Sequence, residues 1–171
     1  MAVAATAVLI GISNLGPARD TTPADGIRVG LPAPEFMGTT LDGEHLDLAS
    51  YRGRPVIVNF WGPSCIPCRD EFALFIDRTA AHAADGLALI GVLMFDPPST
   101  ARDFVRDQGA TWPTVLDPDE TIKTAYRAVA RPQTYFVDRG GVLRHIQVGE
   151  LTAVEFDRFY ADIADPPLTA P

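Results

Sequence analysis

Two cysteines three residues apart stand at the boundary between a predicted buried strand and a predicted helix. The strand is indicated by the apolar, mostly β-branched run 56–60, which is typical of a strand inside a sheet. A helix is expected to follow because apolar residues recur at spacings of three and four, which places them on one face. These residues are Cys68, Phe72, Phe75, Ile76 and Thr79.

Further strands are predicted on both sides of this boundary. The pair Asp42-Gly43 interrupts the segment 36–48, and this pair is a strong signal for a β-hairpin turn. The apolar run 87–94 predicts a second buried strand. Near the end of the chain, two strands joined by a short Gly-containing connection favour an antiparallel hairpin. Its parts are 134–138, 139–141 and 143–148.

Three further helices are indicated by residue types that cap a helix start or end. Ser99 is expected to cap a helix that runs to about Gln108 and stops at Gly109. The segment 117–120, Asp-Pro-Asp-Glu, is a capping-box variant with Asp117 as N-cap, proline at N1 and glutamate at N3. A capping box at 152–155 opens a last helix. Its expected core face holds Phe156, Phe159, Tyr160 and Ile163.

The order of the elements indicates the fold class. It is hairpin, strand, helix, strand, helix, short helix, strand, strand, helix. Strands connected by a helix run parallel, and right-handed crossovers place helices on the sheet faces, whereas the closing hairpin adds antiparallel strands. We therefore predict a three-layer α/β domain in which helices flank a mixed central sheet, with the first β-hairpin as an N-terminal extension.

The length of 171 residues fits one domain with a tail at each end. Residues 1–13 are almost wholly apolar but fewer than the about 20 that span a bilayer, and they are interpreted as the remnant of a signal or membrane anchor. Residues 14–28 are expected to be a linker, because Gly, Pro, Thr and Asp follow in quick succession. The folded domain is then 29–164, and 165–171 is expected to be a flexible tail.

The charge balance and the cysteine count exclude several classes of function. The chain has 14 Lys and Arg against 22 Asp and Glu, a formal net charge of −8. This balance argues against binding nucleic acid, or an anionic membrane surface, through charge. Two cysteines are too few for a disulfide scaffold or a four-cysteine zinc site.

The place of the cysteines at a helix start predicts redox chemistry. A helix N-terminus offers free N–H groups and partial positive charge, which favour a thiolate, and residues three apart there are close enough for a disulfide. Cys65 is expected to be the nucleophile, and Cys68, one turn further and more buried, the resolving cysteine. Ser64 is expected to cap this helix, and 69–71 to form a solvated first turn.

Other interpretations of the pair stay open at this point. The cysteines could form a static, packed pair, or they could hold a metal, although two thiolates need further ligands. The histidines His45, His82 and His145 are scattered along the sequence and are expected to be surface or hairpin residues. No metal or cofactor site is predicted.

The segment around the cysteines resembles the active-site stretch of the TlpA/ResA-like thioredoxin-fold proteins. Residues 59–72 are Asn-Phe-Trp-Gly-Pro-Ser-Cys-Ile-Pro-Cys-Arg-Asp-Glu-Phe. The resemblance implies a thioredoxin-like fold and thiol–disulfide exchange with protein partners through the Cys-x-x-Cys pair. It covers nearly all of the predicted domain, through the segments 30–36, 41–43, 51–53, 112–117 and 131–138.

The resemblance also implies a cellular location and protein partners. The expected location is extracytoplasmic, membrane-anchored or secreted, with a cytoplasmic location as the alternative. The expected protein is a monomeric reductase in cytochrome c maturation or general thiol upkeep, with apocytochrome c and a membrane electron donor as partners. The alternative is a copper-binding metallochaperone or a thiol partner in copper-centre assembly. A peroxidase of this fold is expected to have a Thr-rich loop around a single cysteine. The segment 60–63, Phe-Trp-Gly-Pro, does not resemble such a loop, so a peroxidase is disfavoured.

Four residues outside the pair are assigned roles through the same resemblance. Pro132 matches the family's cis-proline, which faces the cysteines, and the backbone of Arg131 beside it is expected to pair with a bound peptide. Trp61 is expected to pack beside the cysteine loop and to shape the partner surface. Asp96 stands where some members have a glutamate that assists proton transfer. The Arg131 cation is expected either to stabilise the Cys65 thiolate or to point to water at the partner-binding rim.

Overall fold

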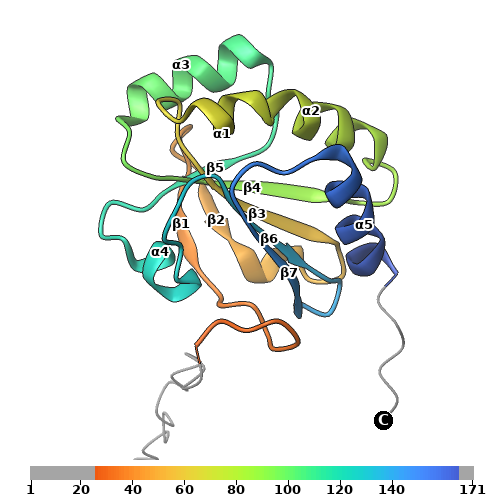
Figure 1. The fold of residues 1–171 in the computed structure, drawn as a ribbon. Helices are drawn as coiled ribbons and strands as arrows, with labels where there is room; N and C mark the ends of the chain where they lie inside the picture. Colours follow the sequence, from red (N-terminus) through yellow and green to blue (C-terminus); the bar gives the residue numbers. More distant parts are fainter. Residues whose placement is uncertain (1–25, 166–171) are drawn as a thin grey trace, which may run out of the picture.

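The computed structural model describes residues 26–165. The expected anchor segment, the linker up to 25 and the tail from 166 lie outside these residues. A five-stranded sheet in the order β5-β4-β3-β6-β7 forms the centre of the fold (Figure 1). The strands are β3 Val56–Trp61, β4 Ala88–Leu93, β5 Thr114–Leu116, β6 Gln133–Val137 and β7 Leu143–Val148.

The sheet is mixed, as predicted. The central strand β3 pairs in parallel with β4 and antiparallel with β6. On the outer sides, β4 pairs in parallel with β5, and β6 pairs antiparallel with β7. The sequence analysis did not predict β5, because a three-residue edge strand is too short to show a period.

Helices cover both faces of the sheet, which confirms the three-layer prediction (Figure 1). On one face, buried apolar side chains of α2 Phe72–Ala81, α3 Pro98–Gln108 and α5 Ala153–Ala164 form a core together with Ile57 and Trp61 of β3. On the other face, Val56, Val58 and Phe60 pack with Ile122 and Tyr126 of α4 Thr121–Tyr126. Alternate residues of β3 therefore belong to different cores.

The predicted N-terminal hairpin is present. The strands β1 Met37–Thr39 and β2 His45–Asp47 pair antiparallel as a separate two-stranded sheet. Gly43 in the connecting turn has a φ of 84°, a conformation that glycine adopts without a steric cost. The 3-10 helix η1 Leu48–Tyr51 follows directly and buries Leu48 in the core shared with α4.

Helix starts differ from the predicted caps in two places. The helix α3 begins at Pro98, with Pro97 at the cap position, so Ser99 is not its cap. Proline at the first position lacks the N–H that a cap would satisfy. The helix α4 begins only at Thr121, because Glu120 takes a left-handed backbone with a φ of 54°. Asp117 still caps it, since its carboxylate accepts the N–H groups of Ile122 and Lys123 at 3.1 and 2.8 Å.

Other predicted helix signals are confirmed. Gly109 ends α3 with a φ of 70°. Thr152 and Glu155 form the predicted capping box at the start of α5, whose expected core face is buried. In the described part of the chain, no helix is both long and apolar enough to cross a membrane.

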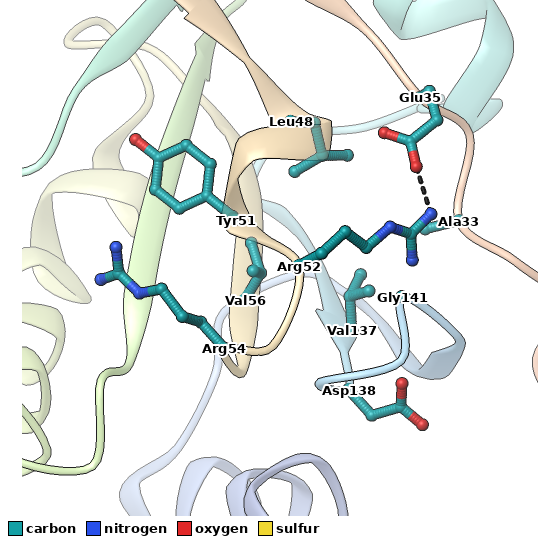
Figure 2. A pocket seen from close by; sticks show the side chains of 10 residues that line it. All are labelled: Ala33, Glu35, Leu48, Tyr51, Arg52, Arg54, Val56, Val137, Asp138 and Gly141. Atoms are coloured by element: carbon teal, nitrogen blue, oxygen red, sulfur yellow. Dashed lines mark hydrogen bonds and ion pairs between the residues drawn. The ribbon is translucent and has the colours of Figure 1, made fainter.

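A small cleft lies at the end of the sheet where β3 begins (Figure 2). It holds about 10 Å³ of space. The disulfide described below follows the opposite end of β3 and is not part of it. The cleft is lined by Ala33, Glu35, Leu48, Tyr51, Arg52, Arg54, Val56, Val137, Asp138 and Gly141.

Candidate active site

The two cysteines form a disulfide at the end of β3. Their Cα atoms lie 5.2 Å apart. Cys65 is the N-cap of the short helix α1 Ile66–Asp70, and its Sγ accepts the N–H of Cys68 at 3.2 Å. The prediction that Ser64 caps this helix is therefore wrong, because a cysteine sulfur takes that position. Cys68 is fully buried, whereas Cys65 is 8% exposed.

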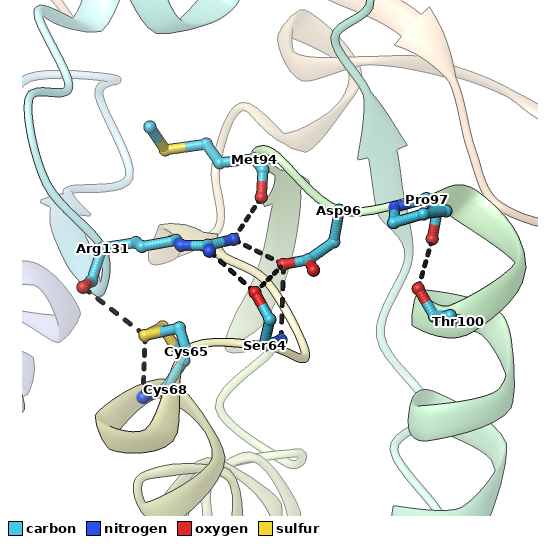
Figure 3. A network of polar contacts seen from close by, with 8 residues as sticks. All are labelled: Ser64, Cys65, Cys68, Met94, Asp96, Pro97, Thr100 and Arg131. Carbon is cyan, nitrogen blue, oxygen red and sulfur yellow. Dashed lines mark hydrogen bonds and ion pairs between the residues drawn. A yellow bond between two sulfur atoms is a disulfide. The ribbon is translucent and has the colours of Figure 1, made fainter.

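The loop that contains Pro132 lies against Cys65. The Arg131–Pro132 peptide bond is cis, as the resemblance implied. The carbonyl oxygen of Arg131 lies 3.5 Å from Cys65 Sγ (Figure 3). The backbone just before Pro132 is thus the nearest part of this loop to the more exposed sulfur.

The side chain of Arg131 takes neither of its two expected positions. It points away from the disulfide and into a polar network with the loop after β4 (Figure 3). Its Nη1 donates to the carbonyl of Met94 at 2.6 Å and to Oδ2 of Asp96 at 2.5 Å, and its Nη2 donates to Ser64 Oγ at 2.8 Å. The Asp96 carboxylate therefore balances the guanidinium charge beside the cysteine loop.

Asp96 joins the same network from the other side. Its Oδ2 also accepts the N–H of Ser64 at 3.3 Å and its hydroxyl at 3.0 Å. The Asp96 side chain is only 9% exposed. A carboxylate oxygen with three donors, one of them a guanidinium, is better suited to holding two loops together than to exchanging protons.

Glu71 is a site residue that the sequence analysis missed. Arg69 and Asp70 are exposed as predicted, but Glu71 is 2% exposed and separates α1 from α2, where one helix was predicted. Its carboxylate accepts the Asn59 side-chain amide at 3.0 Å and the Leu151 N–H at 3.1 Å. The spacing contained the signal, because a residue three after the buried Cys68 shares its helix face.

Burial changes the acidity of Glu71. Desolvation raises its pKa from 4.5 to about 8, and the nearby Glu150 adds to this rise. The hydrogen bonds from Leu151 and Asn59 lower the pKa but do not cancel the effect of burial. The site therefore contains a carboxyl group that can gain or lose a proton near neutral pH, on the helix face of Cys68.

Comparison with known proteins agrees with this geometry. Residues 29–146 match the AhpC/TSA family. The chain belongs to that family. It is 30% identical over 142 residues to the thiol-disulfide oxidoreductase ResA of Geobacillus kaustophilus, covering 83% of this chain and 82% of that protein. It is 32% identical over 136 residues to the thioredoxin-like protein YneN of Bacillus subtilis, covering 78% and 79% of the two chains.

A solved structure supports the same assignment. The crystal structure of a thiol:disulfide interchange protein of the thioredoxin family from Chlorobium tepidum TLS superposes with a TM-score of 0.73 at 26% identity, covering 79% of this chain and 97% of that one. This ResA-like member of the AhpC/TSA family has a thioredoxin-like fold and is a thiol-disulfide oxidoreductase.

Trp61 packs beside the cysteine loop in this ResA-like protein, as expected, but it exposes no surface of its own. It is fully buried, with its ring centroid 4.7 Å from that of Phe72 and 5.7 Å from that of Phe104. It packs beneath the cysteine loop and cannot contact a partner directly, because the aromatic cluster encloses it. Contact with a partner must come from residues with exposed surface.

The histidines lie outside the site. His45 is in β2, His82 pairs with Asp85 at 3.2 Å, and His145 pairs with Asp162 at 2.7 Å. Within residues 26–165 there is no group of three His, Cys, Asp or Glu side chains arranged to hold a metal. Copper bound by the reduced cysteines would therefore have no third ligand of these types among the described residues.

Proposed function

We propose that Cys65 is the residue that attacks protein partners and that Cys68 resolves the mixed disulfide. The observation that carries this assignment is the unequal burial of the two sulfurs: only the Cys65 side of the disulfide reaches the surface. The Cys68 N–H that contacts Cys65 Sγ would also stabilise the Cys65 thiolate after reduction, because a hydrogen bond to the charged form favours it.

The exchange proceeds in two steps with balanced bonds and electrons. In the reduced protein, the Cys65 thiolate attacks one sulfur of the partner's disulfide, forms a mixed disulfide and releases the other sulfur as a thiolate, which takes up a proton. The Cys68 thiolate then attacks Cys65 Sγ and releases the second partner thiol. The partner gains two electrons, and Cys65–Cys68 becomes a disulfide.

Glu71 is proposed to accept the proton that the Cys68 thiol must lose before its attack. It follows Cys68 by three residues, a spacing that brings side chains together on a helix. Its pKa of about 8 lies close to neutral pH, where a group is most effective as a general acid or base. Asp96, the residue first considered for this task, is instead proposed to position the Ser64–Cys65 loop.

The partner's polypeptide is proposed to lie along the backbone at Arg131 and Pro132, whose carbonyl side already contacts Cys65. We further propose an extracytoplasmic protein, tethered or secreted, that acts in the reducing direction as a monomer. The apolar start 1–13 supports the location. Apocytochrome c, as substrate, and a membrane electron donor are the partners that the family resemblance favours.

Trapping experiments test the assignment of the two cysteines. Cys68→Ser is expected to accumulate mixed disulfides between Cys65 and partners in the native host, whereas Cys65→Ser is not. Cys65→Ser/Cys68→Ser is the matched control for thiol-independent binding. Accumulation of adducts on Cys68 in Cys65→Ser instead would overturn the assignment.

Two further measurements test the direction of the exchange and the cellular location of the protein. Equilibration with glutathione gives the reduction potential, and a value well below that of the glutathione pool supports a reductase. Fractionation of the host that expresses the full chain tests the location. Recovery only in the cytosol, with both thiols reduced, would contradict it.

A further inference from the structure

We propose that Phe95 is a specificity-determining residue that favours partners with an apolar side chain beside their cysteine. The inference rests on the proposed exchange with proteins and names the chemistry of the segment that binds. It also assigns a task to Arg131 and Asp96, which hold Phe95 at the rim of the site.

The backbone of Phe95 is unusual. Its φ of 63° lies in the left-handed region, which a bulky residue adopts only when its surroundings require it. The side chain gains little burial in return, because Phe95 is 65% exposed. A strained backbone that presents an aromatic ring to solvent is typical of a functional site.

Arg131 explains how this backbone is held. Its Nη1 binds the carbonyl of Met94 and the carboxylate of Asp96, the residues immediately before and after Phe95 (Figure 3). Bringing these two groups to one nitrogen forces the residue between them outward. The guanidinium carbon also lies 5.5 Å from the Phe95 ring centroid, and Lys123 Nζ lies 4.8 Å from it. The ring is therefore ordered before a partner arrives.

Arg131 connects the held ring to the loop that contacts the reactive sulfur. Arg131 contacts Phe95 with its side chain and lies 3.5 Å from Cys65 Sγ with its carbonyl oxygen. Two more exposed apolar residues flank the same point: Ile66, 71% exposed, follows Cys65 directly, and Val129, 82% exposed, precedes Arg131 by two residues. The segments that contain Cys65, Arg131 and Asp96 thus each carry an exposed apolar side chain.

The charges at this rim are balanced. Arg131 is paired with Asp96, and Lys123 is paired with Glu120 at 2.7 Å. The two cations that face Phe95 therefore add little net charge, in a protein whose net charge is −8. Such a rim fits a polypeptide segment with an apolar residue next to its cysteine. A small hydrophilic disulfide such as oxidised glutathione has no group to place on the ring.

Two peptides that differ in one residue test the proposal. Each carries one cysteine, followed by either leucine or serine, as a mixed disulfide with thionitrobenzoate, and the reduced full-length protein releases the coloured thiol. We expect the leucine peptide to react at least about fivefold faster, as for a contact residue of an interface. Phe95→Ser is expected to bring the two rates together. Val29→Ser, which removes an exposed apolar side chain beside Gly30 at the far end of the sheet, is expected to keep the preference.

A second variant separates recognition from folding. Phe95→Gly accepts a φ of 63° without strain, so it is expected to be at least as stable to heat as the native chain, yet to lose the preference. Arg131→Lys keeps the positive charge but lacks the second nitrogen, Nη2, which donates to Ser64 Oγ at 2.8 Å and fixes the guanidinium in place. It is therefore expected to weaken the preference although Phe95 is intact.

The possible outcomes are distinct. The role of Phe95 would be overturned if the native protein reacted with the leucine and serine peptides at the same rate. It would also be overturned if Phe95→Ser or Phe95→Gly kept the preference for the leucine peptide. Failure of the native protein to release thionitrobenzoate from either peptide would overturn the proposed exchange itself, and the specificity with it. A preference lost in the Phe95 variants and kept in Val29→Ser supports the proposal.

Discussion

Glu71 and Asp138 are both buried carboxyl groups at opposite ends of the central sheet, and their surroundings differ. Glu71 is 2% exposed and accepts one side-chain amide and one backbone N–H, with no cation among its hydrogen-bond partners. Asp138 is 3% exposed, accepts the N–H groups of Gly140 and Val142 at 2.9 Å each, and pairs with Arg144 at 2.6 Å.

The comparison separates a structural carboxylate from one that can exchange a proton. Asp138 has donors and a permanent positive charge that compensate for the loss of water, so it is suited to holding the β6–β7 turn. Glu71 has donors but no cation, and burial therefore favours its neutral form near neutral pH. The less compensated group is the one that follows Cys68 by three residues.

The largest expected effect is the pH dependence of stability due to Glu71. Because its pKa in the folded protein, about 8, exceeds the ordinary 4.5, the folded state holds a proton that the unfolded state releases. The contribution is complete below pH 4.5 and is lost as the pH rises through about 8. The difference in pKa corresponds to at most about 5 kcal/mol in the free energy of unfolding.

Glu71→Gln is expected to make the free energy of unfolding in urea depend less on pH between pH 5 and pH 8. A glutamine does not titrate, so roughly one ionisation is removed. Glu44→Gln, at an exposed position, serves as the control and should retain the pH dependence. An identical slope in the native protein and in Glu71→Gln would show that Glu71 is ionised in the folded state throughout.

At the other end of the sheet, Asp138→Asn is expected to lower stability without changing redox chemistry. The change leaves Arg144 partly buried and without its carboxylate, at a cost of about 2–3 kcal/mol. Urea unfolding measures the loss, and equilibration with glutathione measures the potential. A shift of the reduction potential by about 30 mV would show that Asp138 affects the cysteines at the opposite end of the sheet.

A smaller effect is expected from separating Asp96 from Arg131. Arg131→Thr leaves an unpaired anion near Cys65, which disfavours the thiolate and makes the reduction potential more negative by about 30 mV or less. Asp96→Asn leaves an unpaired cation and should shift the potential in the positive direction by a similar amount. In Asp96→Asn/Arg131→Thr, the two shifts are expected to cancel.

If the two shifts of the reduction potential did not cancel, charge balance would not be the cause. If both single variants and the double variant shifted the potential in one direction, the network would act through the geometry of the Ser64–Cys65 loop, and not through the balance of charge. The Cys65 alkylation rate across pH is a second measure, because it follows the thiolate fraction.

The smallest expected effect is at the exposed ion pair between Arg52 and Glu35, beside the cleft at the far end (Figure 2). Both side chains are more than a third exposed, so water and salt weaken the attraction. Glu35→Gln should change the free energy of unfolding by less than about 1 kcal/mol. A loss comparable to that of Asp138→Asn would show that exposure does not govern these pairs.

The sequence predicted the site well where the signal was local. The place of Cys65 and Cys68 after a buried strand, the cis bond before Pro132 and the capping box of α5 are all present. The prediction failed for residues whose partners lie far along the chain. Ser64 resembled a helix cap, but Asp96, 32 residues later, binds both its N–H and its hydroxyl.

Glu71 shows the same limit. Charged residues at the start of a helix are usually solvated, and the one local signal, the spacing of three from Cys68, does not show that hydrogen-bond donors lie nearby in the core. Its burial depends on Asn59, 12 residues earlier, and on Leu151, 80 residues later, which supply donors inside the core. Arg131 was likewise predicted to face either the thiolate or water, because the sequence does not show that Asp96 lies beside it.

The sequence alone determined the order of the elements apart from the short edge strand β5, the mixed sheet and the position of the disulfide at a strand-to-helix junction, because periodicity and capping act over a few residues. The tertiary structure decided which charges are paired, which carboxyl group is desolvated and which aromatic ring is exposed. These properties depend on contacts between distant segments, such as Arg131 with Asp96 and Glu71 with Leu151. Burial and charge compensation, which control acidity and recognition, exist only after those segments have packed together.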